Sequence, residues 1–187
     1  MCGCGPHARK STVRFIERLR PEGHSLAWHS IHGRVLTIPG SGYAARAMTT
    51  APTMTVEQLQ HFLEGAFPDG PLPYAVESIT GDTVRMRLSV RQENSRPGGT
   101  LSGPSLMALA DCAAYLVIIG QIGPVALAVT TSLHIDFLRK PALIDVVAVG
   151  TLLKLGRQLG VVEVAMYSVG SDEALAKAQV TYSIPPR

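Results

Sequence analysis

The pattern of apolar and polar residues changes period along the chain. Residues 56–67 carry apolar side chains at helical spacing, and Thr55 with Gln58 fits a capping box, so we expect an amphipathic helix there. Further along, short segments alternate apolar and polar residues or are rich in β-branched residues, which is typical of strands. The expected strands are 75–80, 83–91, 126–138, 145–155, 161–169 and 175–184.

A run of almost entirely apolar residues lies between the second and third of these strands. Residues 104–119 predict a helix that ends near Gly120, and Asp111 is its only charged residue. A helix that is apolar on every face is a buried helix, and a buried carboxylate requires a compensating partner. The residues three and four positions away include no cation. Chemistry is therefore the leading explanation for Asp111; the alternative is a structural carboxylate hydrogen-bonded to a buried hydroxyl or backbone group.

The order of these segments predicts an α+β fold. Consecutive strands with short links favour an antiparallel sheet, and we expect hairpins to join the last four strands. A single sheet and a wholly apolar helix bury each other if the sheet curls around the helix.

Composition indicates one globular domain with a basic leader. The chain has 187 residues, of which 46% are hydrophobic and 17% charged. Residues 1–47 hold seven Lys/Arg against two Glu and show no sustained period, whereas residues 48–187 hold ten basic against twelve acidic residues. We interpret 1–47 as a disordered leader or a start assigned too early, rather than a targeting segment or a regulatory extension. The domain is then 48–187, and its charge does not favour nucleic-acid binding.

The sequence lacks the signatures of several other classes of protein. No charge-free apolar run reaches the roughly 18 residues of a membrane span. The three cysteines, Cys2, Cys4 and Cys112, indicate no disulfide scaffold, so a reducing cytoplasm is the simplest location. No His/Cys cluster has metal-ligand spacing, and neither a Gly-x-Ser-x-Gly elbow nor a phosphate-binding loop occurs.

The segment before the apolar helix has the features of a helix start that contacts a ligand. It reads Arg-Pro-Gly-Gly-Thr-Leu-Ser-Gly-Pro over residues 96–104. Pro104 suits the first helical position, which makes Ser102 or Gly103 the cap. The unpaired N–H groups of a helix start can stabilise a developing oxyanion.

Two motifs carry a resemblance to a known family. Residues 99–104, Gly-Thr-Leu-Ser-Gly-Pro, are followed seven residues later by Asp111, and residues 129–141 read Val-Thr-Thr-Ser-Leu-His-Ile-Asp-Phe-Leu-Arg-Lys-Pro. Over residues 56–186 the chain resembles the hotdog-fold acyl-CoA thioesterases of the PaaI-like (phenylacetate-pathway) type. That family reads Gly-Thr-Leu-His-Gly-Gly, so Ser102 stands here at the family's His and Pro104 at its second Gly.

The resemblance implies roles for individual residues. Asp111 matches the acid that acts as nucleophile or as general base on water, and the Gly103 amide matches the one that polarises the thioester carbonyl. Thr130 matches a Ser/Thr that helps to orient the water. Three residues near the helix start are implied to contact substrate: Ser102, Arg96, which falls where some relatives have Asn or Gln, and Asn94, two residues earlier.

The spacing between Gly103 and Asp111 has a consequence for the oligomeric state. Gly103 and Asp111 are eight residues apart, about 12 Å along a helix, whereas both must act within about 3–3.5 Å of one carbonyl. A second copy of the helix would have to supply one of them, so we expect a homo-oligomer, a dimer or a dimer of dimers, with shared sites. Cations at a strand end and at a turn are candidates to hold the phosphates of coenzyme A: Arg139, Lys140 and Arg157.

The expected function is hydrolysis of an acyl-CoA thioester with a small, medium or aromatic acyl group. It requires neither cofactor nor metal, because a thioester is already activated. The alternative is a non-catalytic hotdog protein that binds acyl-CoA as a sensor or assembly module. A hotdog hydratase is less favoured, since those enzymes use a His and the family's His position is Ser102.

Overall fold

The computed structural model describes residues 51–66 and 72–186, so the predicted leader, 1–47, lies outside the described residues. Two helices and eight strands are described, with a short 3-10 turn at Gln92–Asn94. The helices are α1 (Val56–Ala66) and α2 (Gly103–Ile122), and the strands are β1 (Tyr74–Thr80), β2 (Thr83–Leu88), β3 (Ser95–Arg96), β4 (Thr100–Leu101), β5 (Val129–Phe137), β6 (Val146–Leu155), β7 (Leu159–Ser168) and β8 (Ala174–Ser183).

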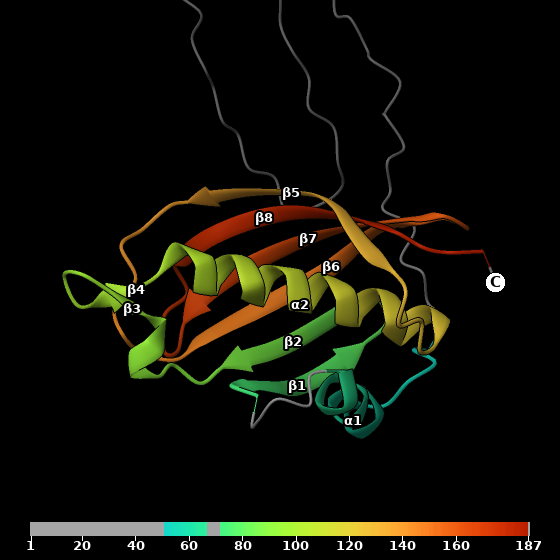
Figure 1. Ribbon diagram of the computed structural model, residues 1–187, viewed down its shortest axis with the longest axis horizontal. Helices are drawn as coiled ribbons and strands as arrows, with labels where there is room; N and C mark the ends of the chain where they lie inside the picture. Colours follow the sequence, from blue (N-terminus) through green and yellow to red (C-terminus); the bar gives the residue numbers. More distant parts are fainter. Residues whose placement is uncertain (1–50, 67–71, 187) are drawn as a thin grey trace, which may run out of the picture. The chain divides into compact units, whose positions relative to one another are not determined.

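The main sheet is antiparallel throughout and has the order β1-β2-β6-β7-β8-β5. It curves around α2, which runs along its inner face, and α1 lies beside β1 (Figure 1). The side chain of Gln60 fixes α1 there, because its amide accepts from the Val76 N–H at 3.0 Å. The predicted α+β fold, with a sheet wrapped around one apolar helix, is confirmed.

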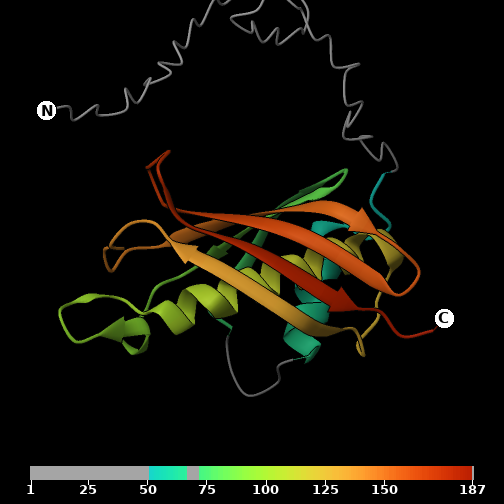
Figure 2. The same ribbon diagram turned by 90° about the horizontal axis from the view of Figure 1, so that it is seen from above.

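One predicted connection is wrong. The strands β6, β7 and β8 follow one another as hairpins, but β5 pairs with β8 at the sheet edge rather than with β6. The reason lies in β6, whose residues Val146, Val147 and Ala148 are all buried, so this strand needs neighbours on both sides. In contrast, β5 lies at the margin of the sheet (Figure 2), and its side chains are exposed on both faces.

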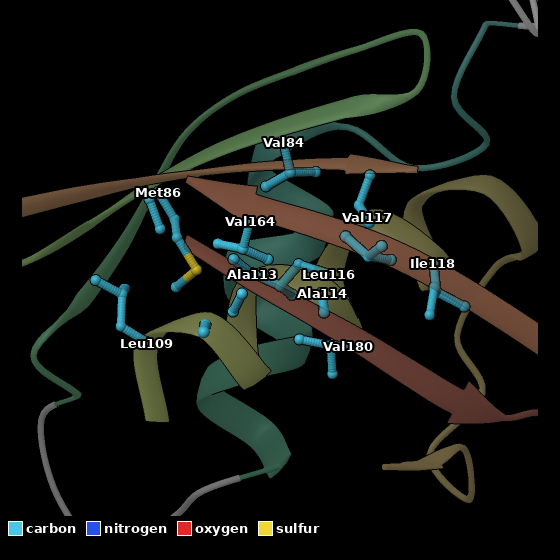
Figure 3. Close-up of a cluster of buried hydrophobic side chains, with 14 of the residues drawn as sticks. Val84, Met86, Leu109, Ala113, Ala114, Leu116, Val117, Ile118, Val164 and Val180 are labelled. Carbon is cyan, nitrogen blue, oxygen red and sulfur yellow. The ribbon is translucent and has the colours of Figure 1, made fainter. Parts of the chain in front are cut away.

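The core lies between α2 and the inner face of the sheet (Figure 3). Ten residues of α2 are buried, and the inward residues of the strands pack against them. At Gly150 the strand β6 lies close to the helix, since an added Cβ would lie 3.2 Å from the Ala113 carbonyl oxygen. Any side chain at this position would push β6 away from α2.

The expectation that α2 is buried on every side is wrong for one face. Met107 is 41% exposed, Ala108 is exposed, and Asp111 is only half-buried. On this face the Asp111 side chain contacts the edge strand β5 through Thr130, and Val129 and Phe137 of that strand are 57% and 52% exposed. By length and hydropathy α2 could cross a bilayer, but within the domain it packs as the core helix under the sheet. Among residues 51–66 and 72–186, this side of the core thus has no cover.

We expect Leu116→Ala to lower the free energy of unfolding by about 2–5 kcal/mol, because it opens a cavity between α2 and the sheet. Leu116 is fully buried. The matched control is Leu153→Ala, since Leu153 is largely exposed and its truncation should change stability by no more than about 0.5 kcal/mol. Urea denaturation followed by circular dichroism measures both. Equal effects of the two variants would contradict the described packing.

Candidate active site

Asp111 lies in the middle of α2, and two hydroxyl groups hold its side chain. Its Oδ1 atom accepts hydrogen bonds from the Thr130 Oγ1 at 2.6 Å and from the Tyr182 hydroxyl at 2.8 Å. Thr130 on β5 and Tyr182 on β8 are directly opposite each other in the sheet. The register of two neighbouring strands therefore brings both donors to one carboxylate oxygen.

No cation forms an ion pair with Asp111 among the residues that the structure describes. Both hydroxyls donate to Oδ1, and within the described chain Oδ2 accepts no hydrogen bond. Oδ2 is also not a buried atom without a partner. The second oxygen is therefore open to a water molecule or a substrate carbonyl, as a general base or a nucleophile requires.

A cavity of about 350 Å³ opens in front of this carboxylate, and we call it the carboxylate pocket. Apart from Asp111, its walls carry no charged side chain, and most of them are small or apolar. The lining residues are Ala66, Asp111, Cys112, Tyr115, Ala126, Ala128, Val129, Thr130 and Tyr182.

Burial perturbs the two titratable neighbours of Asp111. Burial raises the pKa of the Tyr182 hydroxyl far above its usual range; the charge of Asp111 and the hydrogen bond to it act in the same direction, while the Thr130 hydroxyl opposes them. Tyr182 is therefore a neutral donor at any physiological pH. Burial, helped by the charge of Asp111, also raises the pKa of the Cys112 thiol to about 12, so this thiol is not a nucleophile.

At the start of α2, the predicted cap is Ser102. Its Oγ accepts the Ser105 N–H at 3.3 Å, and Gly103 is the first helical residue, which moves Pro104 to the second position. Pro104 has no N–H. The first N–H group of the helix is therefore that of Gly103, and it has no hydrogen-bond partner in the described part of the chain.

The Gly103 amide borders a second cavity, of about 430 Å³, which we call the helix-start pocket. The ring of Phe137, at the end of β5, lies against Gly103, where an added Cβ would be 3.4 Å from Cζ. Arg96 and Lys140 also line this pocket. The Arg96 Nε is held by the Thr100 hydroxyl at 2.8 Å. An unpaired amide and two cations in one cavity suit an anionic ligand with an electron-rich carbonyl.

Two other predicted binding residues, Arg139 and Asn94, already have partners within the chain. Arg139 lines the helix-start pocket, but its guanidinium already pairs with Glu173 at 3.0 Å and donates to the Ala174 carbonyl. The Asn94 amide group donates to the Ser105 hydroxyl at 3.3 Å and accepts from the Arg91 N–H, so it supports the helix start and does not line either pocket.

Arg157 is not close to the other two predicted phosphate ligands within one chain. It lies in the β6–β7 turn, two residues before Leu159, which pairs with Ser183 at one end of β8. Arg139 and Lys140 follow Phe137, which pairs with Ala176 at the other end of β8. The three predicted cations therefore separate into two groups at opposite ends of the sheet.

The sequence interpretation missed Tyr182 as a site residue. The signal was present, because the inward positions of β8 are Ala176, Ala178, Val180 and Tyr182, and only the last is polar. A polar group at an inward position needs a partner, just as a carboxylate in an apolar helix does. The structure pairs the two.

Comparison with known proteins identifies the family. The thioesterase superfamily model matches residues 98–175, which include the helix start and Asp111. A candidate thioesterase from Silicibacter sp. TM1040 is 38% identical, with 75% of this chain and 97% of that chain covered and a TM-score of 0.69. The chain belongs to the thioesterase superfamily. It is a thioester hydrolase with the hotdog fold.

More distant structures share the fold. A thioesterase from Haemophilus influenzae is 21% identical, with 74% of this chain and 96% of that chain covered and a TM-score of 0.63. Zebrafish thioesterase superfamily member 2 is 18% identical, with 71% and 100% covered and a TM-score of 0.64. No curated protein matches the chain in sequence.

We expect Cys112 to react with iodoacetamide at pH 8.5 at least about 100-fold more slowly in the folded protein than in denaturant, because the raised pKa leaves almost no thiolate. Mass spectrometry of the peptide that contains Cys112 measures the rate separately from Cys2 and Cys4. Labelling of Cys112 at the same rate in both states would show that the thiol is neither buried nor protonated as described.

Proposed function

We propose that the protein hydrolyses acyl-CoA thioesters, in the manner of the PaaI-like thioesterases, at sites shared between two copies of the chain. One observation carries the proposal. The candidate base, Asp111, and the candidate oxyanion donor, the Gly103 N–H, open into different pockets and are separated by about 12 Å of helix. A single chain therefore holds half of a reaction centre in each pocket.

The edge strand β5 supports the assembly of these halves. Thr130, near its start, belongs to the carboxylate pocket, and Phe137, at its end, belongs to the helix-start pocket. If two copies pair their β5 edges about a two-fold axis, the strands run antiparallel, so the start of each lies against the end of the other. The carboxylate pocket of one copy then faces the helix-start pocket of its partner.

Exposed apolar side chains support the same arrangement. Leu127, Val129, Phe137 and Leu138 are all at least half exposed along or beside β5, and Met107 is exposed on the neighbouring face of α2. Exposed apolar side chains at an unpaired sheet edge favour association in soluble proteins. The proposed assembly is a homodimer or a dimer of such dimers.

The proposed chemistry follows from the free oxygen of Asp111. Oδ2 takes a proton from water as the water oxygen attacks the thioester carbonyl, and the negative charge that forms on the carbonyl oxygen is stabilised by the Gly103 N–H of the other copy. The C–S bond then breaks, and the proton passes to the leaving thiolate. In the variant pathway, Oδ2 attacks the carbonyl directly and the C–S bond breaks to release the thiolate; water then hydrolyses the resulting acyl anhydride, which frees Asp111 and supplies the proton that the thiolate takes up.

The two pockets differ in charge, which supports the choice of substrate. Arg96 and Lys140 in the helix-start pocket suit the phosphates of coenzyme A, whereas the carboxylate pocket is apolar around Asp111 and suits an uncharged acyl group. A cavity of about 350 Å³ accepts a small, medium or aromatic acyl chain. We place the enzyme in the cytoplasm, and the reaction needs no cofactor or metal.

We expect Asp111→Asn to lower kcat for acyl-CoA hydrolysis by about 10²–10⁴-fold, because an amide cannot take the proton. Release of free thiol from a panel of short, medium and aromatic acyl-CoAs measures the rate, and the corresponding acyl-pantetheines test the need for the nucleotide. The matched control is Glu163→Gln on the exposed side of β7, which should keep full activity. Acyl-CoA binding without turnover in the unaltered protein would instead favour a sensor.

Mixing two inactive variants tests the shared site. We expect Gly103→Val to be inactive, because the added methyl groups enter the helix-start pocket beside Phe137. When it is refolded with Asp111→Asn at equal amounts, half of the dimers are hybrids with one intact site of two, so activity should return to about a quarter of the unaltered level. Hybrids that form, as shown by two affinity tags, yet remain inactive would contradict a site shared between chains.

A further inference from the structure

We propose that Tyr182 is a positioning residue for the reaction, and that its hydroxyl holds the Asp111 carboxylate in the orientation that directs Oδ2 into the carboxylate pocket. This inference rests on the proposed function of Asp111. It concerns a residue outside both of the motifs that identify the family, in the last strand of the sheet.

The geometry restrains the rotation of the carboxylate. A carboxylate that turns about its terminal torsion exchanges Oδ1 and Oδ2, and this torsion is soft in the absence of contacts. The Tyr182 hydroxyl donates to Oδ1 at 2.8 Å and lies 3.2 Å from the main-chain oxygen of the same residue. Thr130 donates to Oδ1 as well. Two donors on one oxygen oppose the exchange.

The two donors differ in how firmly they are held. Thr130 is exposed on the edge strand, whereas Tyr182 is 4% exposed and points into the core from β8. The Tyr182 ring stacks on Tyr115 with centroids 5.7 Å apart, and Tyr115 in turn contacts Phe62 at 6.0 Å. The Tyr115 hydroxyl donates to the Val125 carbonyl at 3.2 Å. Tyr182 is therefore the fixed donor of the pair.

A merely structural tyrosine would have different consequences. If Tyr182 only fills the core, loss of its hydroxyl lowers stability but leaves the ionisation of Asp111 unchanged. If it positions and stabilises the carboxylate, loss of the hydroxyl makes Asp111 more basic, because the charged form loses a hydrogen bond. The acidic limb of the kcat/KM profile then moves to higher pH, since more alkaline conditions are needed to ionise the base.

The test is Tyr182→Phe, which keeps the ring. We expect kcat to fall by about 10–100-fold with KM within about twofold, because the hydroxyl acts on the reacting group rather than on binding. We also expect the acidic limb to move up by about 0.5–1 pH unit. Tyr167→Phe, a half-buried tyrosine on β7, is the matched control and should change none of these. Rates are compared well below the Tm of each variant, so that a loss of stability does not enter.

The outcomes separate this inference from the proposed function. If Asp111→Asn keeps full activity, the proposed function itself is wrong. If Asp111→Asn is inactive while Tyr182→Phe keeps the unaltered kcat and pH profile, only the role of Tyr182 is overturned. A lower kcat in Tyr182→Phe with an unmoved acidic limb also overturns it, because that result describes a packing residue.

Discussion

The burial of α2 against the curved sheet is the interaction on which the rest of the structure depends. Burial of apolar surface is the dominant favourable term in folding, and ten residues of this helix are buried. Within this contact, Gly150 lets β6 lie close to the Ala113 carbonyl. The position of every α2 side chain, including the single carboxylate, is therefore fixed by the packing of the core.

That constraint explains the choice of partners for Asp111. A cation beside a half-buried carboxylate would satisfy its charge but would also make it a poor base. Hydroxyl groups compensate the lost hydration and, among the described residues, leave the second oxygen without a hydrogen bond. The strands supply them where β5 and β8 are in register, with Thr130 from the rim and Tyr182 from the interior. The core thus stabilises the carboxylate without neutralising it.

The features that depend on the local hydrophobic period could be predicted from the sequence, whereas those that depend on which strands pair could not. The apolar run, the alternating strands and the lone charge were sufficient for the α+β fold and for Asp111, because each is visible within one segment. The neighbour of β5 was not visible, since its pairing with β8 joins residues between 39 and 54 positions apart. For the same reason, Tyr182 was assigned to a strand face but not to the site, and Arg157 was grouped with cations at the opposite end of the sheet.

The placement of β5 has a consequence for how a newly synthesised chain becomes active. The strand contributes to the carboxylate pocket at one end and to the helix-start pocket at the other. On the proposed pairing, a monomer folds before it has a complete reaction centre, and both centres of the dimer form in a single association step. Substitutions in this strand would then change both the dimer dissociation constant and the turnover rate. Neither property could change there without the other.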